Sequence, residues 1–258
     1  MKKIRLTFLV TMLTCGFSFP VTAAPNQLAL VIGNSDYDYE PLKNPANDAA
    51  DMADKLRELG FKVVHKLNLN RQEMENAIRD FGKRLDYTPG DDTAVFYYSG
   101  HGTHSDQNYL VPIKSRQIRP YNLKHTAVPE NLILAQMKRY NKNGANIFIL
   151  DACRDNPHPG ARKGLTRRGL TPTLLSKTDM IIALATQAGR TVDDLIDERN
   201  SLYTKQLLKE LKYAHGQPIK KVFRSVSKSV VQASGKKQSP VHVYSIPSDI
   251  CFGGCFNH

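Results

Sequence analysis

The chain has 258 residues, of which 41% are hydrophobic and 23% charged, and this balance excludes a disordered, fibrous or repetitive protein. Its length suits one sizeable domain or two small ones. The formal net charge is +12, but the basic residues are spread along the chain without the interleaved aromatic residues of a nucleic-acid module. We therefore expect a solvated basic surface and no nucleic-acid partner.

The first 23 residues have the three parts of a secretory signal peptide. Lys2, Lys3 and Arg5 form a positive start, an apolar run follows until Pro20, and residues 21–23 (Val-Thr-Ala) match a cleavage site. Cleavage after Ala23, or one residue later, removes three positive charges and leaves +12 − 3 = +9. We expect export, to a bacterial periplasm or beyond, of a domain spanning residues 24–245.

Two alternatives stay open for this segment. Cys15 would be the lipidated residue of a lipoprotein, although Thr14 is a poor fit to the small residue that such a site needs before its cysteine. The segment would otherwise remain as an uncleaved anchor, but its apolar run is shorter than a membrane-spanning helix. We expect no stable membrane insertion of the mature chain.

The apolar patterns alternate between two kinds along the chain. Short continuous runs indicate strands buried on both faces, and apolar residues three or four apart indicate helices. In chain order they predict strands at 27–33, 61–65, 92–98, 108–112, 145–150, 180–185 and 241–245, and helices at 47–59, 71–85, 128–141, 201–213 and 219–232. Asn70 and Glu73 form a capping box at the start of the second helix. The alternation is typical of an α/β fold with a mainly parallel sheet and helices on both faces.

Two of the buried strands run directly into reactive side chains. His101 follows the strand predicted at 92–98, and Cys153 follows the strand at 145–150. Because the carboxyl ends of parallel strands meet at one edge of a sheet, we expect His101 and Cys153 to lie close together. Gly100 and Gly102 flank the histidine and predict a tight turn with room for a substrate.

A cysteine beside a histidine suits nucleophilic catalysis. His101 would take the proton of the Cys153 thiol and later protonate the leaving amine. The backbone N–H groups of Gly102 and Cys153 would stabilise the developing oxyanion. Two other interpretations are an inert buried cysteine with a structural histidine, and a zinc site of His101, His104 and Cys153. The zinc site lacks a second paired ligand element, so we expect no metal.

The last residues, 246–258, form a tail that contains two more cysteines. Cys251 and Cys255 can close a disulfide across a glycine turn, which leaves Cys153 as the single thiol of the mature chain. The sequence alone does not show whether their geometry permits the bond.

Two motifs of this chain resemble those of a known family. Residues 98–102 (Tyr-Ser-Gly-His-Gly) and 151–154 (Asp-Ala-Cys-Arg) are similar to the histidine and cysteine motifs of caspase-like peptidases, with the expected separation of 153 − 101 = 52 residues. The cysteine motif continues as Asp-Asn-Pro, which resembles the bacterial, metacaspase-related branch. Segments 42–49 and 200–204 extend the resemblance over most of residues 27–245. It implies a caspase-like three-layer α/β fold.

The resemblance also implies an activity. It implies a cysteine endopeptidase that uses the Cys153–His101 dyad on protein or peptide substrates, with an acidic pocket of Asp48 and Asp151 that takes Arg or Lys before the cleaved bond. Without the resemblance, Asp48 is a helix-start residue and Asp151 a backbone cap. The other two functions left open are a catalytically silent caspase-like module for binding or regulation, and a different Cys–His amidase.

Three properties of such a peptidase remain open. The basic loop at 159–168 is either a self-cleavage site or a solvated loop. No cofactor is required, but calcium activates metacaspase relatives. The sequence contains no EF-hand loop, and its acidic cluster (Asp193, Asp194, Asp197 and Glu198) is equally typical of an exposed polar loop. The oligomeric state is not indicated.

Overall fold

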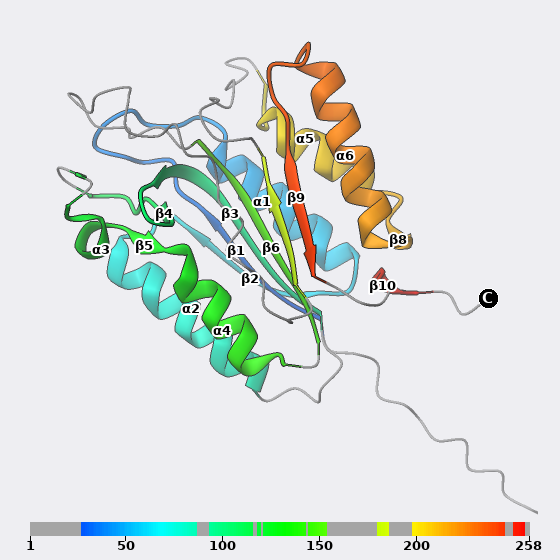
Figure 1. Cartoon of the computed structure of the whole chain (residues 1–258), viewed down its shortest axis with the longest axis horizontal. Coiled ribbons are helices and arrows are strands. Elements are labelled where there is room, and N and C mark those ends of the chain that lie inside the picture. Colours follow the sequence, from blue (N-terminus) through cyan, green and yellow to red (C-terminus); the bar gives the residue numbers. More distant parts are fainter. Residues whose placement is uncertain are drawn as a thin grey trace, which may run out of the picture.

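A computed structural model shows the fold and describes residues 27–86, 93–115, 118–119, 121–142, 144–153, 180–185, 198–245 and 250–255. The predicted signal peptide, the basic loop at 159–168 and Asp193, Asp194 and Asp197 lie outside the described residues. Figure 1 shows the arrangement of the elements that follow.

The strands are β1 (Gln27–Gly33), β2 (Lys62–Leu67), β3 (Thr93–His104), β4 (Asn108–Leu110), β5 (Val128–Pro129), β6 (Ala145–Cys153), β7 (Met180–Leu184), β8 (His215–Gly216), β9 (Val241–Ser245) and β10 (Phe252–Cys255). The helices are α1 (Pro45–Glu58), α2 (Arg71–Asp86), α3 (Leu123–Thr126), α4 (Glu130–Tyr140), α5 (Leu202–Leu211) and α6 (Ile219–Ala233). Every predicted strand and helix is present, with bounds that differ by a few residues.

The central sheet has the strand order β2-β1-β3-β6-β7-β9. Its first five strands are parallel to their neighbours, and the edge strand β9 is antiparallel to β7. β4 and β5 extend one end of β3 as an antiparallel side branch. The prediction of a mainly parallel sheet is confirmed.

Helices cover both faces of this sheet (Figure 1). Side chains alternate along β3, so Val95 and Tyr97 join the core beneath α1, α5 and α6, whereas Phe96 and Tyr98 join the core beneath α2 and α4. This is the three-layer α/β arrangement expected from the resemblance. Among the described residues, none of the helices is long and apolar enough to cross a membrane.

The strand predicted to end at residue 98 continues to His104, and the tight turn expected at the glycines around His101 is wrong. The backbone stays in a strand because new partners replace those that β3 loses. Gly102 pairs with Leu110 and His104 pairs with Asn108 in the antiparallel β4. His101 therefore lies within a strand rather than in a loop.

The helix predicted from residue 128 begins two residues later, at Glu130. Pro129 has an extended backbone (φ −70°, ψ 137°), and with Val128 it forms the short strand β5. Proline at this position suits the residue just before a helix, because its missing N–H is not needed there.

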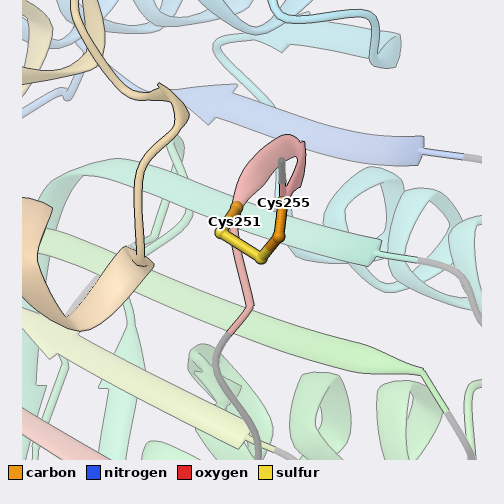
Figure 2. Close-up of a disulfide and its surroundings, with 2 residues drawn as sticks. All are labelled: Cys251 and Cys255. Atoms are coloured by element: carbon orange, nitrogen blue, oxygen red, sulfur yellow. A yellow bond between two sulfur atoms is a disulfide. The ribbon is translucent and has the colours of Figure 1, made fainter. Parts of the chain in front are cut away.

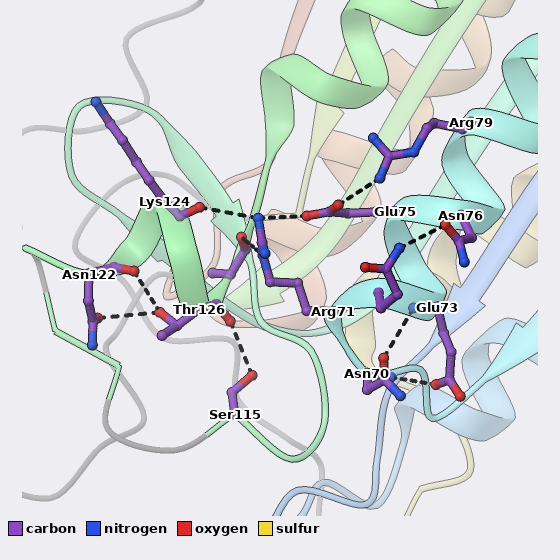
Figure 3. A network of polar contacts seen from close by, with 12 residues as sticks. Asn70, Arg71, Glu73, Glu75, Asn76, Arg79, Ser115, Asn122, Lys124 and Thr126 are labelled. Carbon is purple, nitrogen blue, oxygen red and sulfur yellow. Dashed lines mark hydrogen bonds and ion pairs between the residues drawn. The ribbon is translucent and has the colours of Figure 1, made fainter.

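The capping box predicted for α2 is confirmed. Asn70 accepts a hydrogen bond from the Glu73 N–H at 3.1 Å, and the Glu73 carboxylate accepts one from the Asn70 N–H at 2.8 Å. Figure 3 shows this pair beside Arg71, which contacts Glu75 at 2.7 Å and donates to the Lys124 carbonyl at 3.2 Å. Arg71 thereby links α2 to α3 through its contact with Lys124.

The tail contains the disulfide between Cys251 and Cys255, which the sequence had left open (Figure 2). The strand β10 within it pairs in parallel with β8, and Phe252 is buried in the core near Phe61 at a ring distance of 6.4 Å. These two short strands were not predicted, since neither has an apolar run of its own.

Candidate active site

His101 and Cys153 occupy neighbouring positions in the sheet. β3 and β6 are parallel, and their register pairs His101 with Cys153 at the last residue of β6. The backbones of the two residues therefore meet, as the strand-end pattern predicted. The Cys153 side chain lies outside the described residues.

The imidazole of His101 is held by a backbone carbonyl. Its Nε2 lies 2.8 Å from the Glu40 oxygen, and a carbonyl can only accept, so Nε2 carries the proton of the neutral ring. Nδ1 is then the nitrogen able to accept a proton. Glu40 has φ +52°, a left-handed backbone that is uncommon for a side chain other than glycine.

Asp48 and Asp151 lie in one buried polar cluster, with exposures of 0% and 4%. Asp48 accepts from the Ser99 hydroxyl and from the Ser201 N–H, both at 3.0 Å. Asp151 accepts from the Ser201 hydroxyl and from the Thr204 hydroxyl, the latter at 2.6 Å. The two carboxylates come from α1 and β6, and the start of α5 links them.

Burial changes the protonation of this cluster. The loss of solvent, and next the charge of Asp151, raise the pKa of Asp48 to about 8. Hydrogen bonds from Ser201 and Ser99 act in the opposite direction and are outweighed. A cation that entered the cluster would favour the ionised form of Asp48.

Three hydroxyl residues of this cluster, Ser99, Ser201 and Thr204, were not predicted as site residues. Ser201 also caps α5, since its hydroxyl accepts from the Thr204 N–H at 3.0 Å. That capping pattern is visible in the sequence, but the second contact, to Asp151 50 residues away, is not. The helix-start interpretation of Asp48 is correct for its place in α1, although its side chain points to Ser99 rather than to its own helix.

The remaining predicted residues lie near His101 on β3. Gly102, proposed for the oxyanion, is paired with Leu110 of β4. His104 contacts Asn108 through its Nδ1 at 3.0 Å. In the described part of the chain, no group of three or more His, Cys, Asp or Glu side chains is arranged to hold a metal ion.

Comparison with known proteins supports the resemblance. The family model described as the caspase domain matches residues 26–250 of this chain. The chain is 35% identical over 133 residues to the human mucosa-associated lymphoid tissue lymphoma translocation protein 1, a match that covers 51% of this chain and 15% of that protein. It is 30% identical over 129 residues to mouse caspase-12, covering 50% and 30% of the two chains.

A third relative, human inactive caspase-12, is 30% identical over 132 residues, which is 51% of this chain and 37% of that protein. These matches cover about a sixth to two fifths of the relatives' own lengths. The family model, by contrast, extends over β1 to β9 and all six helices described above, including His101 in β3 and Cys153 at the end of β6. The chain belongs to the caspase domain family.

Proposed function

We propose that this protein is a cysteine endopeptidase, related to the bacterial metacaspase branch, that cleaves peptide bonds after Arg or Lys. The observation that carries the proposal is the register of β3 and β6, which pairs His101 with Cys153. A histidine and a cysteine whose backbones are paired on adjacent parallel strands have the proximity that a nucleophile and its base need.

The reaction follows from the tautomer of His101. Nδ1 takes the proton of the Cys153 thiol, and the thiolate attacks the carbonyl carbon of the substrate to form a tetrahedral oxyanion. The N–H groups of Gly102 and Cys153 donate to this oxyanion. His101 returns its proton to the amine as the peptide bond breaks, and water then hydrolyses the thioester to free the Cys153 thiol.

The preference for Arg or Lys rests on Asp48 and Asp151. Two carboxylates in a partly dry site select a cationic side chain through charge-assisted hydrogen bonds. In the structure both carboxylates are buried against serine and threonine hydroxyls, so a substrate side chain would replace some of these contacts. The hydroxyl groups can rotate and accept from an incoming guanidinium or ammonium group.

The proposal also includes export through the signal peptide at residues 1–23. Edman sequencing of the protein secreted by a bacterial host tests the cleavage after Ala23. Retention of residues 1–23 in the purified protein would contradict the proposed processing.

Hydrolysis of fluorogenic peptides that end in Arg, Lys or Asp tests the activity, with and without calcium, for the wild type and for Cys153→Ala. We expect Cys153-dependent release after Arg and Lys and little after Asp. Asp48→Asn and Asp151→Asn should each reduce kcat/KM for Arg peptides by about tenfold to a hundredfold.

The same assay separates the two other functions. A binding or regulatory module is favoured by the likeness to a protein named inactive caspase-12, and it predicts no hydrolysis of any peptide. Cys153-dependent hydrolysis of simple amides but not of peptides would indicate a different amidase. Either result overturns the endopeptidase proposal.

A further inference from the structure

Two buried tyrosine side chains hold the backbone of His101, and the reaction described above uses neither. The Tyr37 hydroxyl accepts a hydrogen bond from the His101 N–H at 2.9 Å. The Tyr98 hydroxyl donates to the His101 carbonyl at 2.8 Å. Both peptide groups of the proposed base are therefore bonded to phenols.

The His101 backbone bonds to tyrosine side chains because β1 is too short to pair with it. β1 ends at Gly33, where it is paired with Ser99 of β3. The next residue, Asn34, donates a hydrogen bond from its N–H to the Ser99 carbonyl at 3.0 Å. Backbone groups two residues apart on a strand point to the same side, so those of His101 face the space beyond the end of β1. A buried peptide group needs a partner. There the Tyr37 hydroxyl accepts from the His101 N–H. The Tyr98 hydroxyl and the Val111 N–H both donate to the His101 carbonyl.

The two phenols also bond to each other. Their oxygens lie 3.1 Å apart, and both are within hydrogen-bond distance of the Val111 carbonyl, at 3.1 Å for Tyr37 and 2.9 Å for Tyr98. Burial raises the pKa of the Tyr37 phenol and that of the Tyr98 phenol well above the ordinary value of a tyrosine, so each phenol keeps its proton. The pair is thus a neutral network that connects His101 to the residue after β4.

Tyr37 contacts the ring of His101 as well as its backbone. The ring centroids are 4.5 Å apart with an interplanar angle of 55°. The close contact of the two tyrosine side chains with this part of β3 requires glycine at position 100. A Cβ there would lie 2.6 Å from the phenol oxygens of Tyr37 and Tyr98. One residue therefore limits both the backbone position and the ring orientation of His101.

We propose that Tyr37, supported by Tyr98, is a positioning residue that fixes the imidazole of His101 relative to Cys153. The inference rests on the proposed function, since it assigns Tyr37 a role in that reaction. Displacement of a reacting group by about 1 Å can reduce a rate about a hundredfold, so a lost hydrogen bond to the His101 N–H would be measurable.

The test compares Tyr37→Phe with the matched variant Tyr109→Phe. Both changes remove one phenol oxygen and keep the ring. Tyr109 is also buried, but its hydroxyl donates to Asp106 at 2.9 Å in the neighbouring hairpin. For Tyr37→Phe we expect kcat to fall about tenfold to a hundredfold with KM changed by less than about twofold. Tyr98→Phe should have a smaller effect, because the Val111 N–H still donates to the His101 carbonyl.

A second readout does not depend on peptide hydrolysis. Iodoacetamide alkylates the Cys153 thiolate, and mass spectrometry of the Cys153 peptide gives its rate as a function of pH. A well-placed histidine lowers the pKa of a neighbouring thiol. We expect the alkylation profile of Tyr37→Phe to move towards that of an ordinary thiol, near pH 8.5, and the Tyr109→Phe profile to match the wild type.

The results separate the two proposals. If the wild type hydrolyses no peptide, the peptidase proposal fails, and the alkylation profiles still test the role of Tyr37. If Tyr37→Phe lowers the melting temperature but leaves kcat and the alkylation profile unchanged, its role is structural and the inference is overturned. Equal losses of kcat in Tyr37→Phe and Tyr109→Phe would also overturn it.

Discussion

Ser201 bonds Asp48 and Asp151 at the same time. Its backbone N–H donates to Asp48 at 3.0 Å, and its hydroxyl donates to Asp151. The same hydroxyl accepts a hydrogen bond from the N–H of Thr204, in the first turn of α5. A single residue thereby connects the two carboxylates of the proposed substrate pocket and caps the start of α5.

Ser201→Ala removes the cap of α5 and one donor to Asp151, while the backbone contact to Asp48 stays. We expect a loss of about 2–3 kcal/mol in the free energy of unfolding, from a helix cap and a charged hydrogen bond. Urea denaturation measures it. Ser225→Ala, at a half-buried position of α6, is the control and should cost less than about 1 kcal/mol. Equal losses in the two variants would contradict the bridging role.

Asp48→Asn should change how stability depends on pH. The ordinary pKa of this carboxyl is 3.8, and it is about 8 in the folded protein. Between these values the folded state keeps a proton that the unfolded state has lost, so Asp48 lowers stability as the pH rises. Asparagine cannot ionise, and we expect the fall in melting temperature between pH 5 and pH 8 to be smaller in the variant.

Asp51→Asn is the control for this pH dependence. A hydrogen bond from Arg199 lowers the pKa of Asp51, so the stability from Asp51 is present above its ordinary pKa and is lost as the pH falls. Its replacement should leave the fall between pH 5 and pH 8 unchanged. Identical pH profiles for Asp48→Asn and the wild type would show that Asp48 is ionised in the folded protein.

Gly100→Ala tests whether the two phenols next to His101 need the space that glycine leaves at position 100. The new Cβ would lie 2.6 Å from the phenol oxygens of Tyr37 and Tyr98, and φ is +156°. We expect a loss of about 1–3 kcal/mol in the free energy of unfolding, together with a large fall in kcat. Gly235→Ala is the matched control, since φ is +59° and no atom lies within 4 Å of its Cβ. It should cost about 1 kcal/mol and leave kcat unchanged.

Replacement of both Cys251 and Cys255 by serine should destabilise the tail. The disulfide closes a loop of about five residues, for which the chain-entropy relation gives roughly 2 kcal/mol. Thermal melts under oxidising conditions measure the change. Phe252→Ala should have a further cost of about 3 kcal/mol, because this buried ring packs against the core. If the serine variant melts at the wild-type temperature, the bond does not restrain Phe252.

The residues predicted by the resemblance fall into two groups in the structure. His101 and Cys153 are paired by the register of two adjacent strands, and Asp48 and Asp151 share a cluster. The tight turn at His101 was a wrong prediction, because glycines on both sides suggested a loop and β4 instead continues the pairing. Local patterns predicted the strand β4 itself, but they could not show that it pairs with residues 102–104 and so extends β3.

The sequence by itself determined the chain order of the longer strands and helices, the capping box of α2 and the placement of His101 and Cys153 just after two buried apolar runs. These depend on local burial patterns and on backbone chemistry within a few residues. Only the tertiary structure decided that Ser201 joins Asp48 to Asp151 and that Tyr37 holds His101. Those contacts join residues 50 to 153 positions apart, and only the packing of α1 and α5 and the early end of β1 bring them together.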